Sequence, residues 1–90
     1  MVMCFSEFGR RVAQNNSGGT DHGAAAPMFI AGGKVKGGLF GEYPSLTDLD
    51  DGDLKHTTDF RRVYATILDR WLNVDSSKVL KNKFDPIDFV

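Results

Sequence analysis

An aspartate and a histidine stand side by side at positions 21 and 22, inside a glycine-bearing segment that precedes an apolar run. A carboxylate oxygen and an imidazole nitrogen are both ligands of divalent metals. At a loop turn the two side chains can converge on one ion, whereas in an extended strand neighbouring side chains point to opposite faces. Asp21 and His22 are therefore predicted to lie in a loop, where they could form a pair of metal ligands. A hydrogen-bond network within that loop is the alternative, and the dipeptide alone favours it.

Three charged residues near the N-terminus could complete such a site. Glu7 ends the apolar run that starts at Val2. If that run and residues 28–31 are neighbouring parallel strands, their ends share one rim of the sheet, and Glu7 becomes a third metal ligand. The alternative for Glu7 is a surface carboxylate paired with Arg10 or Arg11. The two guanidinium groups match the geometry of sulfate and phosphate, so they are candidates for an oxyanion site, with a solvated pair as the alternative.

Other residues that could bind a metal or react are assigned structural roles. Residues 48–53 contain four aspartates, but their glycine falls one place too early for the twelve-residue calcium loop. An acidic turn before a helix is therefore preferred to a calcium site. Cys4 is the only cysteine, which excludes an internal disulfide, and its apolar neighbours predict a buried core residue rather than a reactive thiol. His56 is assigned a surface or capping role.

The elements that must position these residues follow from hydrophobic patterning. The apolar runs at Val2 to Ser6 and Met28 to Ala31 predict two buried strands. A helix is predicted from Asp59 to Leu72, with a threonine as its cap and Asn73 as its left-handed terminator. One face of this helix is apolar, and its residues recur at three- and four-residue spacing: Phe60, Val63, Tyr64, Ile67, Leu68, Trp71 and Leu72.

Length and composition limit the organisation of the chain. Ninety residues predict a single domain over residues 1–90 with a small core. A net charge of -1 gives no electrostatic reason to expect nucleic acid or an anionic membrane as a partner. The chain has no apolar run long enough for a membrane span and no signal-peptide pattern. The apolar residues in 84–90 predict that the C-terminal segment packs against the domain.

Several motifs in this order resemble one protein family. The motifs are Ser-Glu-Phe-Gly-Arg-Arg at 6–11, Gly-Gly-Thr-Asp-His-Gly at 18–23, Ala-Pro-Met-Phe at 26–29, Gly-Gly-Lys-Val-Lys-Gly-Gly at 32–38 and Thr-Thr-Asp-Phe-Arg at 57–61. Together they resemble the domain of unknown function 1501, a sulfatase-like family of the alkaline phosphatase and sulfatase superfamily. The resemblance runs along the whole chain. It implies that these ninety residues are the C-terminal part of a longer, exported protein.

The resemblance also implies a fold and a set of site residues. The expected fold is α/β, a C-terminal fragment of an alkaline-phosphatase-like fold, with short, mostly parallel strands and one main amphipathic helix on one face. His22 matches a superfamily histidine that binds metal, with Asp21 and Glu7 as further ligands. Phe8 replaces a histidine at a strand end and cannot ligate. Arg10 and Lys34 are the implied oxyanion partners, and zinc, calcium and magnesium are not distinguished.

The resulting functional hypothesis is a segment of a metal-dependent hydrolase of sulfate or phosphate esters. No catalytic nucleophile is assigned within the chain, so it is expected to be inactive in isolation and to need the N-terminal part of the same fold. One alternative is a non-catalytic binding or surface-associated module of the same fold. Another is a small protein that forms a homodimer through an exposed sheet edge.

Overall fold

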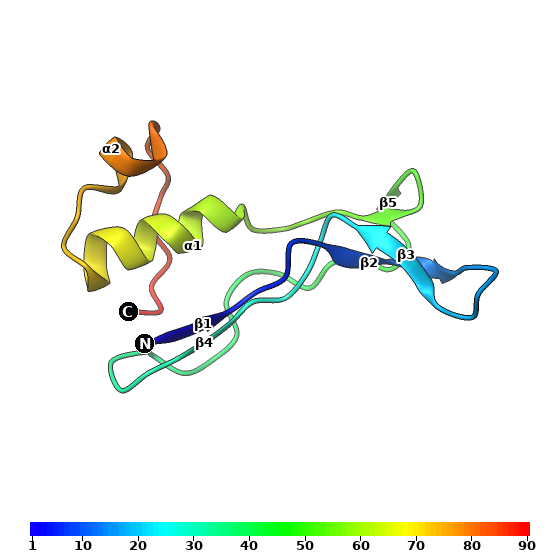
Figure 1. The fold of residues 1–90 in the computed structure, drawn as a ribbon, viewed down its shortest axis with the longest axis horizontal. Helices are drawn as coiled ribbons and strands as arrows, with labels where there is room; N and C mark the ends of the chain where they lie inside the picture. The colour runs from blue at the N-terminus through cyan, green and yellow to red at the C-terminus, as the bar shows by residue number, and fades with distance from the viewer. The chain divides into compact units, whose positions relative to one another are not determined.

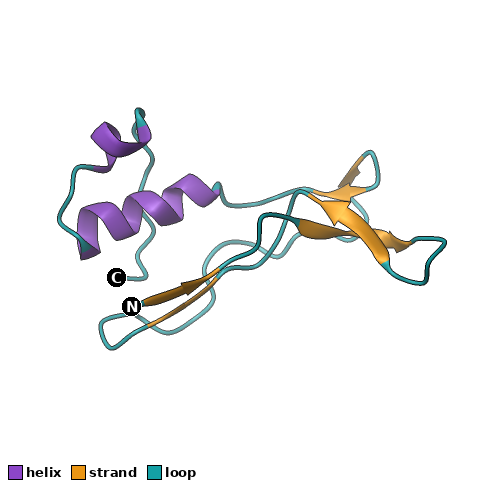
Figure 2. Cartoon of the chain, in the orientation of Figure 1, coloured by secondary structure: helices purple, strands orange, loops and turns teal.

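The computed structural model describes all residues, 1–90, and divides them into two compact units. The first unit comprises Met1–Ala31 and Glu42–Thr57, and the second comprises Gly32–Gly41 and Thr58–Val90. All strands belong to the first unit and all helices to the second (Figure 1; Figure 2). The organisation of residues 1–90 as a single domain stays a prediction.

The first unit consists of three sheets, each of two antiparallel strands. They pair β1 (Val2–Cys4) with β4 (Phe29–Ala31), β2 (Gly9–Gln14) with β3 (Thr20–Gly23), and β5 (Leu49–Asp50) with β6 (Asp53–Leu54). The predicted strands at the N-terminus and at residues 28–31 are thus present as β1 and β4, but the prediction that they are buried is wrong, since Val2 and Phe29 are exposed. The other two strand pairs were not predicted.

The predicted α/β fold with mostly parallel strands is wrong, because every strand pair is antiparallel. The connections explain this result for two of the three pairs. Only residues 15–19 join β2 to β3, and only Asp51 and Gly52 join β5 to β6. Parallel neighbours need a crossover of a dozen residues or more, so such short links permit antiparallel pairing only. Asp51 (φ 49°) and Gly52 (φ 81°) both have positive φ, as the favoured two-residue hairpin turn requires.

The second unit is built around the predicted helix. It begins as α1 (Phe60–Thr66) and continues as a π-helical segment, η1 (Ile67–Trp71), so the predicted span is confirmed. The cap is Asp59 rather than a threonine, because its carboxylate accepts a hydrogen bond from the Arg61 N–H at 2.9 Å. Asn73 has the predicted positive φ, 53°, just after the helix. A second helix, α2 (Ser76–Leu80), follows.

The buried residues of the chain lie almost entirely in this second unit. Val63, Ala65 and Phe89 are its buried hydrophobic residues, and Thr66 is fully buried. The hydroxyl of Thr66 accepts a hydrogen bond from the Ile87 N–H at 2.7 Å, which ties residues 84–90 to α1 as predicted. The first unit, by contrast, buries no hydrophobic side chain. No helix has the length and apolar composition that a bilayer span requires.

Candidate functional site

The β2–β3 hairpin brings an arginine, a histidine and a phenylalanine together, and we call Phe8, Arg10 and His22 the Arg10–His22 cluster. Arg10 and His22 lie directly opposite each other in the ladder. The Phe8 ring stacks on the imidazole, with ring centroids 3.6 Å apart and planes 14° apart. The Arg10 guanidinium carbon lies 5.3 Å from the Phe8 ring centroid. Phe8 therefore supports both polar side chains.

The cluster retains hydrogen-bonding groups for a ligand. Arg10 Nη1 donates to the backbone carbonyl of Thr20 at 2.9 Å, which fixes the guanidinium while its other N–H groups stay available. Stacking covers one face of the His22 ring, but the two ring nitrogens point outward in the ring plane. Arg10 and His22 are both exposed. A fixed positive charge beside an imidazole can hold the oxygens of a sulfate or phosphate group.

Two glycines at the open end of the hairpin allow other chain segments to pack directly beside the cluster. Gly9 and Gly23 are opposite each other in the ladder, next to the pair formed by Arg10 and His22. A Cβ atom on Gly9 would lie 1.6 Å from the carbonyl oxygen of Ala25. A Cβ atom on Gly23 would lie 2.5 Å from Asp53 Oδ1. Neither position tolerates a side chain without movement of its neighbours.

Asp53 anchors the chain just after His22. Its Oδ2 accepts a hydrogen bond from the Ala24 N–H at 2.9 Å, and its Oδ1 is buried against the hairpin without a hydrogen-bond partner in the protein. The β5–β6 hairpin is further attached by Arg11, whose guanidinium donates to the carbonyl of Asp51. Arg11 therefore has a structural partner, and Arg10 is the member of the predicted arginine pair that lies in the cluster.

The predicted ligand pair is separated by the strand in which it lies. Residues 20–23 form β3 rather than a loop, so the adjacent side chains of Asp21 and His22 project to opposite faces. Asp21 Oδ1 instead accepts a hydrogen bond from Asn15 Nδ2 at 3.1 Å. Asn15 also accepts from the backbone N–H groups of Ser17 and Gly19, both at 3.0 Å. Asp21 thus belongs to the hydrogen-bond network that was the alternative prediction.

No contact with the side chains of the Arg10–His22 cluster is found for Glu7, and Lys34 belongs to the other unit. Glu7 is exposed in the bend between β1 and β2. Lys34 belongs to the second unit, where its ammonium lies 5.9 Å from the centroid of the Trp71 ring. No group of three or more His, Cys, Asp or Glu side chains is arranged to hold a metal ion. The residues of this chain therefore do not fit a metal site by themselves, and the divalent metal stays a prediction.

The structure agrees with the turn predicted at residues 48–53 but not with the burial predicted for Cys4. The acidic segment is the β5–β6 hairpin, and Asp48 pairs with Lys55 at 2.8 Å, an interaction that raises the pKa of Lys55. The predicted acidic turn is therefore present at Asp51 and Gly52. The prediction that Cys4 is buried is wrong, since its thiol is exposed. Its sheet has only two strands, and the face that carries Cys4 and Phe29 is open.

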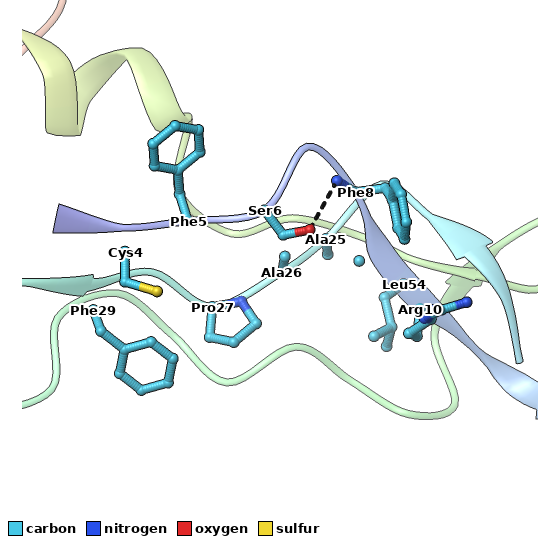
Figure 3. A pocket seen from close by; sticks show the side chains of 11 residues that line it. Cys4, Phe5, Ser6, Phe8, Arg10, Ala25, Ala26, Pro27, Phe29 and Leu54 are labelled. Atoms are coloured by element: carbon cyan, nitrogen blue, oxygen red, sulfur yellow. Dashed lines mark hydrogen bonds between the residues drawn. The ribbon is translucent and has the colours of Figure 1, made fainter.

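A groove of about 640 Å³ begins beside the cluster and runs along the first unit (Figure 3). Its walls are mainly apolar and include Phe5, Phe8, Pro27, Phe29 and Leu54. Arg10 is the one charged residue that lines it. Figure 3 shows Arg10, Phe8 and Leu54 at one end of this groove and Cys4 and Phe29 at the other.

A family model described as "Protein of unknown function (DUF1501)" matches residues 1–84. The chain belongs to the DUF1501 family. The predicted family is thereby confirmed, and the matched range of the DUF1501 chain includes both the Arg10–His22 cluster and the groove. Neither the curated proteins nor the solved structures include a significant match.

Sequence reasoning missed the contributions of Phe8 and Asp53 to this part of the DUF1501 protein. Phe8 was interpreted only as a lost ligand, whereas it forms the stacking surface for His22. The Asp51-Gly52 dipeptide is a strong hairpin signal, and it places Asp53 at the start of a returning strand. The polar turn at residues 15–19 is a second such signal, since a hairpin there sets Arg10 opposite His22.

Proposed function

We propose that this DUF1501 chain is the C-terminal segment of a sulfatase-like hydrolase of sulfate or phosphate esters, and that it supplies the anion-binding part of the site. The cross-strand pair of Arg10 and His22, supported by Phe8, is the observation that carries the proposal. Both side chains are exposed on one hairpin, and both can donate to oxyanion oxygens. The resemblance of the sequence motifs to a sulfatase-like family supports the same assignment.

In this proposal the chain binds and orients the ester anion. The Arg10 guanidinium neutralises charge on the oxygens of the sulfate or phosphate group, and it is already held in place by Thr20. The His22 imidazole contributes a hydrogen bond from an orientation that Phe8 fixes. A nucleophile and any metal ligands would come from other residues of a longer, exported protein, so the ninety-residue chain binds without turnover.

A second candidate is a non-catalytic binding module of the same family. Two observations favour it: Phe8 stands where a ligand was expected, and Asp21 is engaged with Asn15 rather than placed beside His22. Such a module would bind the same anions through the Arg10–His22 cluster. It would not hydrolyse esters in any longer form of the protein.

The proposal is tested on a longer DUF1501 protein that contains these residues. Hydrolysis of 4-nitrophenyl sulfate and 4-nitrophenyl phosphate is measured together with the metal content of the purified protein. Arg10→Gln is expected to raise KM by roughly 10- to 100-fold, because it removes a charge-assisted hydrogen bond to the ester. His22→Asn should weaken activity as well.

The matched control is Lys83→Gln, which also removes one positive charge but lies on the exposed surface of the second unit. Its KM should equal that of the unmodified protein. A protein that binds sulfate through Arg10 but hydrolyses neither ester would support the binding module instead. Absence of sulfate binding would contradict both candidates.

A further inference from the structure

The charged and apolar side chains of the groove beside the Arg10–His22 cluster lie in different places. Arg10 provides a single positive charge at one end, and the rest of the wall is apolar or small (Figure 3). Phe29 exposes 66% of its surface, so its ring is available for contact with a ligand, whereas the Phe5 ring projects in the opposite direction (Figure 3). The volume of about 640 Å³ is in the usual range of small-molecule sites.

Polar groups along the groove are few. The hydroxyl of Ser6 accepts a hydrogen bond from the Phe8 N–H at 3.4 Å, and the remaining polar side chain away from Arg10 is the Cys4 thiol. A sugar in this groove would lose water from its hydroxyls without gaining partners, which is unfavourable. A flat aromatic group would instead bury apolar surface and contact the phenylalanine rings in favourable geometries.

We infer that the groove holds the organic part of the ligand and that the ligand is an aromatic monoester of sulfate or phosphate. This inference rests on the proposed function, because the ester group is placed at Arg10 and His22. The aromatic group then extends from Phe8 and Leu54 toward Phe29 and Cys4, which line the far end (Figure 3). Charge complementarity selects the anion, and the apolar wall selects the aromatic group over a carbohydrate.

The test uses the ninety-residue chain and four probes: 2-naphthyl sulfate, 2-naphthyl phosphate, inorganic sulfate and 2-naphthol. Affinities are measured by calorimetric titration. Each naphthyl ester is expected to bind roughly tenfold or more tightly than either inorganic sulfate or 2-naphthol, because only the ester makes both the charged and the apolar contacts. Equal affinities of inorganic sulfate and the naphthyl esters would overturn the inference.

The exposed Cys4 thiol provides a second measurement at the far end of the groove. Saturating 2-naphthyl sulfate should slow alkylation of Cys4 by N-ethylmaleimide, whereas inorganic sulfate should leave the rate unchanged. Alkylation at the same rate with and without the naphthyl ester would show that the aromatic group does not lie in the groove.

Two substitutions separate the contribution of the apolar contacts to affinity from that of the charged contact. Phe29→Ser should lower the affinity for the naphthyl esters toward that of inorganic sulfate, and Arg10→Gln should lower it toward that of 2-naphthol. Phe60→Ser is the control, since Phe60 is 55% exposed and belongs to the second unit. It should change neither affinity, and an equal loss in Phe60→Ser and Phe29→Ser would contradict the assignment.

The remaining outcomes distinguish this inference from the proposed function. Sulfate binding at Arg10 without preference for a naphthyl group overturns the inference and leaves the proposed function standing. Naphthyl ester binding as described, with no hydrolysis in a longer protein, overturns the hydrolase and leaves the ligand class standing. A dimer that Phe29→Ser dissociates, together with no naphthyl binding, would assign the groove to a second copy of the chain.

Discussion

Replacement of Thr66 by valine should destabilise the second unit by removing one buried hydrogen-bonding group. Thr66 is fully buried, and its Oγ1 donates to the carbonyl of Arg62 and accepts from the Ile87 N–H, both at 2.7 Å. Valine preserves the shape of threonine but cannot accept a hydrogen bond. Thr66→Val therefore leaves the Ile87 N–H without a partner beside the buried face of α1.

The expected magnitude follows from that unsatisfied group. A buried polar group that loses its partner costs about 1–3 kcal/mol. In a domain of this size each kcal/mol lowers the melting temperature by about 4–8 °C, so Thr66→Val should lower it by roughly 5–20 °C. Thr66→Ser keeps the hydroxyl and loses one methyl group, which costs about 1 kcal/mol. Valine should therefore be at least as harmful as serine, although it preserves more apolar surface.

Fluorescence gives a reading that is specific to this unit, because Trp71 is the only tryptophan and lies in η1. Thermal and urea unfolding are followed for the unmodified chain and both variants. Hydrogen exchange at the Ile87 amide adds a local measurement, and exchange should accelerate in Thr66→Val more than in Thr66→Ser. If Thr66→Val were as stable as the unmodified chain while Thr66→Ser was weaker, packing of the methyl group rather than the hydrogen bond would tie the C-terminal segment to α1.

Three further predictions concern the first unit and acid stability. Gly9→Ala should abolish sulfate binding in an NMR titration, because its Cβ would lie 1.6 Å from a backbone oxygen, whereas Gly33→Ala, with no atom within 4 Å of its Cβ, should bind normally. Asp53→Ala should weaken sulfate binding by releasing the backbone after β3, and Asp53→Asn should restore it, since an amide oxygen can still accept; equal losses would contradict the anchoring role. Side-chain hydrogen bonds hold the pKa of Asp75 and Asp88 below their ordinary 3.8, so their stabilisation of the second unit is present above pH 3.8 and is lost as the pH falls through the lower native values. The variant with both Asp75→Asn and Asp88→Asn should lose less stability than the unmodified chain as the pH falls. An equal loss of stability in acid would show that these two carboxylates are not its cause.

The helical unit was predictable because its signals are local. The apolar spacing between Phe60 and Leu72 predicts a helix without reference to the rest of the chain. Asn73 ends it with a positive φ, which asparagine adopts more readily than most residues. The buried hydrogen bond between Thr66 and Ile87 was not predictable in this way, since it joins residues 21 positions apart.

The strand unit was less predictable because its apolar runs are short and lack a distinctive period. Residues 2–5 and 28–31 read equally well as strands of a parallel or an antiparallel sheet. The expectation of parallel strands rested on the continuous apolar runs and on the family resemblance, whereas the short connections at residues 15–19 and at Asp51-Gly52 argue against it. Those two turns fix the direction of their strands through connection length alone.

The backbone of residues 20–23 was also predicted wrongly, as a loop rather than a strand. This strand separates the side chains of the two residues that first suggested a metal site. A two-residue motif specifies which side chains are adjacent in sequence, but the local backbone decides whether they share a ligand. In a loop Asp21 and His22 could have met at one ion, whereas β3 sends them to opposite faces. Asp21 then stabilises the turn through Asn15, and His22 gains Arg10 as a cross-strand neighbour and Phe8 as a stacking partner. The hairpin thus replaces a sequence-adjacent pair of candidate metal ligands with a cross-strand pair that suits an anion.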